Sequence, residues 1–228
     1  MIKGFQEVSF IDFPDTIAAV IFTGGCMFRC PFCHNKDLAM NSLSLKDISL
    51  DYVLARIKER SSVLGGVVIT GGEPTIHAKL PELLLALKKT GLKIKLDTAG
   101  INPDMLTKVL PYLDYIAMDI KHTPKKYSKA TGRPVQIHRI EKSIAIIKNS
   151  GIPYEFRTTV VPTIHTLNDF HALGKFISGS TVLYLQKFIP NPLMIDITLT
   201  EKPSDAFLLK AQTILQSYVS RVEIRSYT

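Results

Sequence analysis

Long apolar runs and cysteines are both scarce in this chain, and each shortage narrows the class of protein. No run of about 18 apolar residues occurs, so the sequence predicts no membrane-spanning helix. The opening MIKGFQEVSF has no apolar stretch followed by a small-residue cleavage site, so we expect no secretory signal and a cytoplasmic protein. The 228 residues contain no linker or low-complexity segment, which predicts a single domain over residues 1–228.

Acidic residues are outnumbered, 20 against 28 basic ones, which gives a net charge of +8. The lysines are scattered, as at Lys88–Lys89 and Lys125–Lys126, and no long basic tract occurs. We therefore expect a solvated surface, with neither a nucleic acid nor a membrane as partner. A basic face that receives an acidic electron carrier remains an alternative.

The chain has only three cysteines, Cys26, Cys30 and Cys33, all within eight residues. An odd, clustered set argues against a disulfide framework and for a metal site. Three thiolates can bind three irons of a cubane 4Fe–4S cluster, and without a fourth cysteine one iron keeps an exchangeable position. The alternative is a zinc site completed by His34, although such sites usually draw ligand pairs from two separate loops.

Apolar β-rich runs alternate with amphipathic helical stretches along the whole chain, a pattern typical of parallel βα units. The expected strands are Ile17–Thr23, Val67–Thr70, Lys93–Asp97, Tyr115–Ile120, Tyr154–Val161 and Val182–Lys187, with Arg221–Arg225 following and Gln6–Phe10 pairing at the edge. The expected helices include Leu80–Thr90, one that starts at Asn102–Pro103, one that ends before Gly151, and Ala206–Val219. Six units are two short of a closed barrel, so we predict an α/β fold, a partial (β/α)6 TIM-like barrel that is open laterally.

Polar motifs follow several of these strands, where the chemistry of parallel α/β folds collects. The cysteines follow the first strand and Gly71-Gly72-Glu73-Pro74 follows the second. Further along are Asp97-Thr98, then Met118-Asp119-Ile120-Lys121, and Arg157 within the fifth strand. Charged groups on core strands are costly to bury alone, so we expect them to form a ligand shell. A purely structural salt-bridge network among Asp97, Asp119, Lys121 and Arg157 is the alternative.

The C-x3-C-x-aromatic-C signature, with Phe32 as the aromatic residue, together with the Gly-Gly-Glu-Pro element, resembles the radical S-adenosylmethionine (SAM) superfamily. This resemblance implies that Cys26, Cys30 and Cys33 hold the cluster and that the open iron chelates SAM. The reduced cluster of that superfamily cleaves SAM to methionine and a 5′-deoxyadenosyl radical. The cofactor-binding residues that it implies are Phe32, Gly71, Gly72, Glu73, Asp97, Thr98, Asp119, Lys121 and Arg157, and it implies no catalytic residue beyond the cluster and SAM.

Other segments narrow the resemblance to glycyl-radical-enzyme activases. Gly4-Phe5-Gln6 and Cys33-His34-Asn35 are similar to segments of anaerobic ribonucleoside-triphosphate reductase activating proteins, and the later strand ends are shared with pyruvate formate-lyase activase. These activases remove a hydrogen from a backbone glycine of a partner glycyl radical enzyme under anaerobic conditions. The resemblance also implies flavodoxin or ferredoxin as electron donor, and a monovalent cation bound by Asp97, Thr98, the Met118 carbonyl and Asp119.

Departures from the activase pattern leave a second function open. Asp15, His77 and Ala99 stand where the activases usually have other residues. A compact small-molecule enzyme, similar to 7-carboxy-7-deazaguanine synthase, is the alternative. Within the cysteine segment, Met27 and Phe28 are expected to pack over the cluster and limit its contact with water.

Overall fold

The computed structural model describes residues 1–225 and builds them around one sheet of eight strands in the order β1 to β8. The first pair, β1 and β2, is antiparallel, and every later neighbouring pair is parallel. The strands are β1 (Ile2–Ser9), β2 (Ala18–Thr23), β3 (Gly66–Gly71), β4 (Lys93–Thr98), β5 (Tyr115–Asp119), β6 (Tyr154–Val160), β7 (Val182–Lys187) and β8 (Arg221–Arg225).

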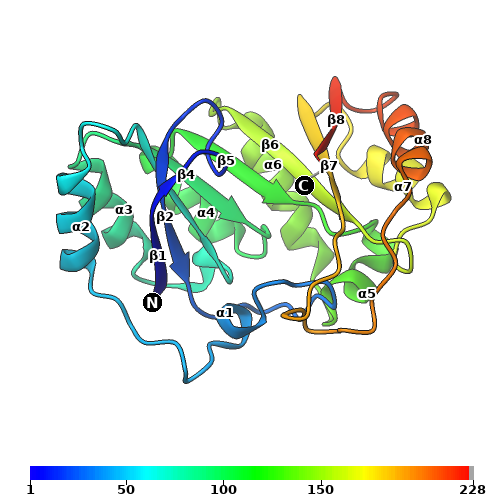
Figure 1. Cartoon of the computed structure of the whole chain (residues 1–228). Helices are drawn as coiled ribbons and strands as arrows, with labels where there is room; N and C mark the ends of the chain where they lie inside the picture. The colour runs from blue at the N-terminus through cyan, green and yellow to red at the C-terminus, as the bar shows by residue number, and fades with distance from the viewer. Residues whose placement is uncertain (226–228) are drawn as a thin grey trace.

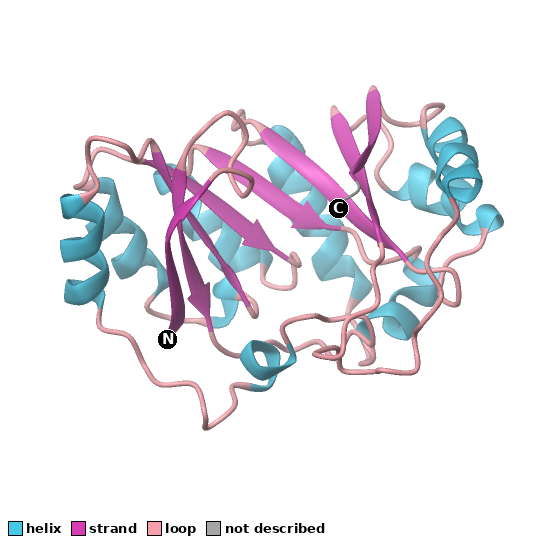
Figure 2. Ribbon diagram, viewed as in Figure 1, coloured by secondary structure: helices cyan, strands magenta, loops and turns pink. Residues whose placement is uncertain are grey.

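Most of the helices lie along the outer side of the curved sheet, which leaves its inner side for the site (Figures 1 and 2). The α-helices are α1 (Lys36–Met40), α2 (Leu50–Glu59), α3 (Leu80–Lys88), α4 (Pro103–Val109), α5 (Tyr127–Thr131), α6 (Ile137–Asn149), α7 (Leu167–Phe176) and α8 (Asp205–Leu215). Three short 3₁₀ turns are η1 (Pro74–Ile76), η2 (Leu110–Tyr112) and η3 (Pro124–Lys126).

The sheet curves as a barrel wall but does not close, because β1 and β8 are its two ends and do not pair with each other. This confirms the predicted α/β fold with a laterally open barrel. The six predicted strands correspond to β2–β7, and β8 extends the parallel sheet beyond them. Figure 1 shows the opening between the N-terminal strands, in blue, and β7 with β8.

Several elements differ from the sequence-based expectation: α1 and α5 were not predicted, α8 ends at Leu215 rather than Val219, and β1 and α2 differ as follows. The first strand begins at Ile2, where it pairs with Thr23, rather than at Gln6. Its backbone pairing with β2 overrides the weak local strand preference around Gly4. Helix α2 was not predicted, although Ser49 caps it and Val53 and Ile57 are buried along one face.

The core forms where the apolar strand faces meet the helices, and local signals fix several boundaries. Residues 67–69 of β3 and the apolar face of α3 are fully buried. Asn102 caps α4 as predicted, accepting the Met105 N–H at 3.2 Å, with Pro103 in the first turn. No helix within residues 1–225 is long and apolar enough to cross a membrane.

Candidate active site

The cysteine loop, defined here as residues 24–35, leaves the carboxyl end of β2 and runs into α1. Backbone bonds hold it, since the Gly25 N–H donates to the Leu38 carbonyl at 2.6 Å and the Cys26 N–H to the Ala39 carbonyl at 3.0 Å. The Arg29 guanidinium donates to the Cys26 carbonyl at 2.7 Å. None of these three bonds uses a cysteine sulfur, although the Cys26 sulfur accepts a long bond from the Phe28 N–H, at 3.4 Å.

All three cysteines line one cavity of about 290 Å³ at the carboxyl ends of the parallel strands. Cys30 is buried, whereas Cys26 and Cys33 are half-buried. Burial raises the pKa of the Cys26 thiol to about 12 and that of Cys30 to about 11. Because metal ligation needs thiolates, a bound cationic centre has to supply the compensating charge.

The positions of the metal-ligating side chains indicate which kind of metal centre this cavity can hold. Within residues 1–225, no three His, Cys, Asp or Glu side chains converge as they would around a single metal ion. In a cubane cluster each cysteine binds a different iron, so the sulfurs stand farther apart than the ligands of one ion. His34, the fourth ligand of the zinc alternative, lines the same cavity, and its ring centroid lies 6.3 Å from that of Phe188. The three cysteines match three irons of a cluster, with one sulfur for each iron.

We call the backbone contact between Gly71–Gly72 and the cysteine loop the glycine wall. The Gly72 N–H donates to the Thr23 carbonyl at 2.8 Å, and the Glu73 N–H to the Gly25 carbonyl at 2.8 Å. A β-carbon on Gly72 would lie 2.0 Å from the Gly25 oxygen, and Gly71 has a φ of +114°. Only glycine fits such backbone-to-backbone contact, so the Gly-Gly pair fixes the position of the cysteines.

Glu73 lies behind the cavity rather than in its lining. Its carboxylate accepts hydrogen bonds from the Thr98 hydroxyl at 2.7 Å, the Ala99 N–H at 2.5 Å and the Thr75 N–H at 3.1 Å. Burial raises its pKa, against the effect of these hydrogen bonds. The carboxylate thus ties the end of β3 to the end of β4. This position gives no support to the predicted contact between the Glu73 side chain and SAM.

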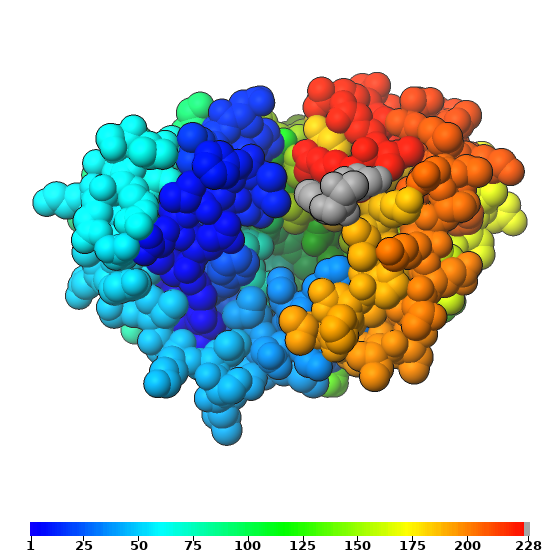
Figure 3. All heavy atoms as spheres, in the orientation of Figure 1, coloured from blue at the N-terminus to red at the C-terminus, as the bar shows by residue number. Residues whose placement is uncertain are grey.

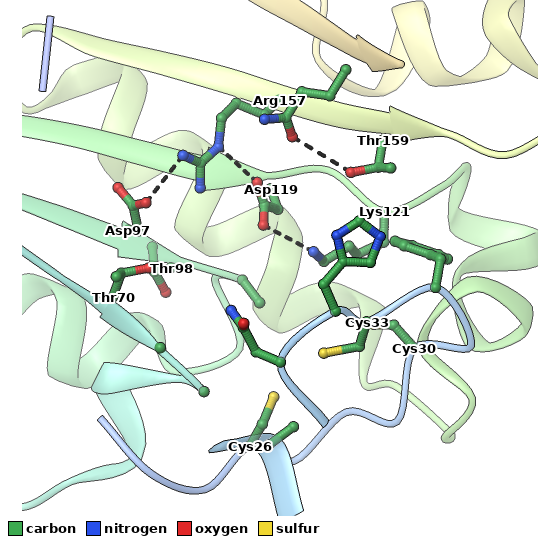
Figure 4. Close-up of a pocket in the computed structure, with 18 residues that line it drawn as sticks. Cys26, Cys30, Cys33, Thr70, Asp97, Thr98, Asp119, Lys121, Arg157 and Thr159 are labelled. Carbon is green, nitrogen blue, oxygen red and sulfur yellow. Dashed lines mark hydrogen bonds and ion pairs between the residues drawn. The ribbon is translucent and has the colours of Figure 1, made fainter. Parts of the chain in front are cut away.

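The opposite side of the cavity, which we call the charged wall, consists of Asp97 and Asp119 near the ends of β4 and β5, Lys121 just after β5, and Arg157 in the middle of β6. The Arg157 guanidinium donates to Asp97 at 3.1 Å and to Asp119 at 2.8 Å, and Lys121 donates to Asp119 at 2.9 Å (Figure 4). The charges alternate along the wall. This is the network of the structural alternative, yet all four residues also line the cavity.

These charges persist at neutral pH. Burial alone would raise the pKa of Asp119, but Arg157 and Lys121 outweigh it and hold that pKa well below its usual value. Asp97 shows the same balance, with Arg157 and Lys95 lowering its pKa. The pKa of Lys121 is raised, because Asp119 outweighs the effect of burial. The wall thus presents fixed positive and negative charges to the cavity.

The side chains of three predicted cation ligands have hydrogen-bond or ion-pair partners of their own. Asp97 and Asp119 each give an oxygen to the same guanidinium, and the Thr98 hydroxyl donates to Glu73. Arg157 thus supplies the positive charge between the two carboxylates that a cation would otherwise supply. The four-residue cation site stays a prediction without support from this geometry.

The sequence did not lead us to predict two buried charged side chains behind the charged wall, those of Lys95 and Glu155. The Lys95 ammonium bonds to Asp97 at 2.6 Å and to the Asp12 carbonyl at 2.7 Å, and Glu155 pairs with Arg225 at 2.9 Å. Each lies two residues before a wall residue on the same strand. Side chains at i and i+2 share a strand face, so opposite charges at this spacing were an available signal.

Met27 differs most from its expected role. Its side chain is 60% exposed, whereas Phe28 is buried as predicted. Met27 lines a second cavity, on the outer side of the cysteine loop, together with Ile76, Ile101 and Pro134. Thr70 and Thr159 also line the first cavity and were not predicted to do so. The connection after β7 contacts the cysteine loop, because the Asp196 N–H donates to the Pro31 carbonyl at 2.9 Å.

Comparison with known protein families gives a match to the radical SAM superfamily over residues 20–177. MJ1227 of Methanocaldococcus jannaschii, which carries a provisional name as a glycyl-radical enzyme activating enzyme, is 27% identical over 99% of this chain and 96% of its own length. The pyruvate formate-lyase-activating enzyme of Clostridium pasteurianum is 28% identical over 72% of this chain and 69% of its own.

Solved structures share the fold at lower identity. SuiB of Streptococcus suis bound to S-adenosylmethionine superposes with a TM-score of 0.69, at 17% identity over 92% of this chain and 50% of that chain. At 17% identity, this structural similarity shows a shared fold and nothing more.

Proposed function

The chain belongs to the radical SAM superfamily, and we propose that it activates a glycyl radical enzyme by removing a hydrogen atom from a backbone glycine of that partner. Membership implies an iron–sulfur cluster and SAM as cofactors and makes the protein an enzyme. When reduced, such a cluster cleaves SAM to methionine and a 5′-deoxyadenosyl radical. The observation that carries the proposal is the similarity over 99% of the chain to a relative named among the activating enzymes.

We propose that Cys26, Cys30 and Cys33 would hold one 4Fe–4S cluster, with one iron left without a protein ligand. Their three sulfurs line the same cavity, and residues 1–225 contain no other cysteine. The glycine wall ties the cysteine loop to the end of β3 through backbone hydrogen bonds.

SAM would lie between the glycine wall and the charged wall. Gly71 and Gly72 bring bare backbone to the cavity, and Lys121 and Arg157 offer cations to the SAM carboxylate. Asp119, beside them, is the acceptor for ribose hydroxyls. Phe32 lines the same cavity, with its ring centroid 5.9 Å from the Lys121 ammonium, and so presents an apolar surface next to the charges.

The lateral opening suits a protein substrate. Figure 3 shows the molecule hollowed between the N-terminal strands, in blue, and the C-terminal segments, in orange and red. A glycine-bearing loop entering this side could itself exclude water from the cavity, which protects a radical from quenching. The partner that we propose first is an anaerobic ribonucleoside-triphosphate reductase, and the second is a pyruvate formate-lyase-like enzyme.

The test is electron paramagnetic resonance on reduced, reconstituted protein mixed with SAM and the candidate partner. A glycyl radical doublet is expected, and it should vanish when the partner's glycine is replaced by Ala. Rapid turnover of a purine precursor without any protein partner would overturn the proposal in favour of a small-molecule enzyme similar to 7-carboxy-7-deazaguanine synthase.

A further inference from the structure

Lys121 of the charged wall stands just beyond the regular part of the sheet. Strand β5 ends at Asp119, and the Ile120 N–H still donates to the Arg157 carbonyl of β6, at 2.7 Å. Beyond this bond the chain leaves the sheet. A cavity residue at such a place needs other contacts to fix the direction of its side chain.

Two side chains from other segments hold the backbone of Lys121. Its N–H donates to the hydroxyl of Tyr127 in α5 at 3.3 Å, and its carbonyl accepts from the imidazole of His165 at 3.0 Å. Tyr127 and His165 are each 1% exposed, so water does not compete for these two bonds. The path of the chain at Lys121 therefore depends on both partners.

The ring proton of His165 lies on the nitrogen that faces Lys121. The Val161 N–H donates to His165 Nδ1 at 3.2 Å, so Nδ1 is an acceptor and the proton is on Nε2. Burial lowers the pKa of His165 to about 4, which keeps the ring neutral near pH 7. The bond to the Lys121 carbonyl is thus an Nε2–H donor bond from a neutral imidazole.

The orientation of the His165 ring is fixed by its neighbours. It stacks on His122 with 4.6 Å between centroids and on Phe170 with 6.1 Å, and both interplanar angles are 13°. His122, which follows β5, makes the reciprocal link, since its Nε2 bonds to the Ile164 carbonyl at 3.0 Å. The two histidines thus tie the segments after β5 and β6 together, but only His165 bonds to a residue that lines the inner cavity.

We propose that His165 is a positioning residue for SAM binding, which acts by holding the Lys121 backbone so that the ammonium group faces the inner cavity. The inference rests on the proposed contact between Lys121 and the SAM carboxylate. His165 lies behind the cavity rather than in its lining. The Lys121 ammonium lies 2.9 Å from Asp119 and 5.9 Å from the Phe32 ring centroid, and a shift of its backbone would change both distances (Figure 4).

The test measures equilibrium binding of SAM to reconstituted protein, with the iron content of each variant determined alongside. In His165→Asn the amide oxygen can still accept the Val161 N–H, but no donor reaches Lys121, so SAM should bind about tenfold more weakly. In His165→Gln the side-chain amide reaches the position of Nε2 and can donate to the Lys121 carbonyl. This variant should bind SAM within about threefold of the wild type.

The matched control is His122→Asn, which loses the corresponding bond to the Ile164 carbonyl, outside the inner cavity. Urea unfolding should show a loss of stability similar to that of His165→Asn. The SAM affinity of His122→Asn should nevertheless stay within about twofold of the wild type, because the bond to Lys121 remains. A merely structural role of the histidines would affect both variants alike.

The double variant Lys121→Ala/His165→Asn tests whether His165 acts through Lys121. If it does, the double variant should bind SAM no more weakly than Lys121→Ala alone, since the two losses are then the same loss. A further loss in the double variant would overturn the inference. Equal weakening by His122→Asn, or equal binding by His165→Gln and His165→Asn, would also overturn it.

The same measurements separate this inference from the proposed function. Unchanged SAM binding in Lys121→Ala would reject the proposed contact between Lys121 and SAM, and the role of His165 with it. Weakened binding in Lys121→Ala together with wild-type binding in His165→Asn would reject the role of His165 alone. A failed glycyl radical assay alongside the expected SAM affinities would count only against the proposed partner class.

Discussion

The two walls of the inner cavity are built by different physical means. In the glycine wall, backbone meets backbone at hydrogen-bonding distance and no side chain contributes to the contact. In the charged wall, long side chains from three strands meet in an alternating series of ion pairs. The first wall depends on shape and tolerates no added atom. The second depends on charge balance and can lose a member while its neighbours keep partners.

The largest effect is expected in the glycine wall. Gly72→Ala would force a β-carbon to within 2.0 Å of the Gly25 oxygen, and neither backbone can move without breaking β3 from the cysteine loop. We expect the free energy of unfolding to fall by more than about 4 kcal/mol and the iron content to drop. Urea unfolding and iron analysis measure both.

Gly91→Ala is the matched control for this variant. Gly91 has a φ of +78°, but nothing lies within 4 Å of the position that an added β-carbon would take. Its replacement should therefore lower the free energy of unfolding by only about 1 kcal/mol, the penalty for a left-handed backbone conformation at a residue with a β-carbon. Equal losses in the two variants would mean that close packing does not define the glycine wall.

Two substitutions at the charged wall should distinguish an effect on protein stability from an effect on ligand binding. Arg157→Met and Lys95→Met each remove a buried cation beside Asp97, so each should lower the free energy of unfolding by roughly 3–5 kcal/mol. Of these two cations, only Arg157 lines the cavity. SAM affinity should fall roughly ten- to a hundredfold in Arg157→Met and stay within about twofold in Lys95→Met.

Equilibrium binding of SAM to reconstituted protein is the measurement for this pair. If Arg157→Met binds SAM as tightly as Lys95→Met does, the wall is a structural salt-bridge network and not a ligand shell. The same measurement on Asp119→Ala and Lys121→Ala extends the comparison along the wall.

A smaller, pH-dependent effect is expected behind the charged wall. His165 donates to the Lys121 carbonyl at 3.0 Å and stacks on His122, and burial lowers its pKa to about 4. Burial also lowers the pKa of His122. For Asp169, burial alone would raise the pKa, but hydrogen bonds from Lys126 and Thr166 lower it to about 2, so it stays charged in this range.

The unfolded chain, with an ordinary histidine pKa of about 6.5, binds more protons than the folded one between pH 6.5 and 4. The stability that His165 contributes is therefore present above pH 6.5 and is lost as the pH falls. Between pH 6.5 and 5.5 the loss should be about 1 kcal/mol in the cluster-free protein. His165→Phe should flatten this slope in urea titrations, and an unchanged slope would contradict the assignment.

Sequence reasoning located the groups that stand at strand ends, because residue type and position along a βα repeat determine them. The cysteines follow β2, Gly71–Gly72 end β3, and Asp119 ends β5, as that pattern predicts. Side-chain direction was harder to foresee. Glu73 turns behind the cavity because the Ala99 N–H and two threonines offer it donors there, which only the folded arrangement reveals.

The exposure of Met27 could not be predicted for a similar reason. An apolar residue beside a cysteine looks like core, but Met27 lines a second cavity with Ile76, Ile101 and Pro134, which are distant in the sequence. Helix α2 did carry a signal, since Val53 and Ile57 follow the capping Ser49 at helical spacing. The sequence carried little signal for the start of β1, because that boundary is set by its pairing with β2.

The proposed activity is tested most directly by following the hydrogen itself. The partner enzyme is prepared with deuterium on the α-carbon of its glycine and mixed with reduced protein and SAM, and the 5′-deoxyadenosine is examined by mass spectrometry. We predict that deuterium appears in the 5′-deoxyadenosine in proportion to the glycyl radical formed. SAM cleavage that yields only unlabelled 5′-deoxyadenosine, with the glycine still deuterated, would contradict the account.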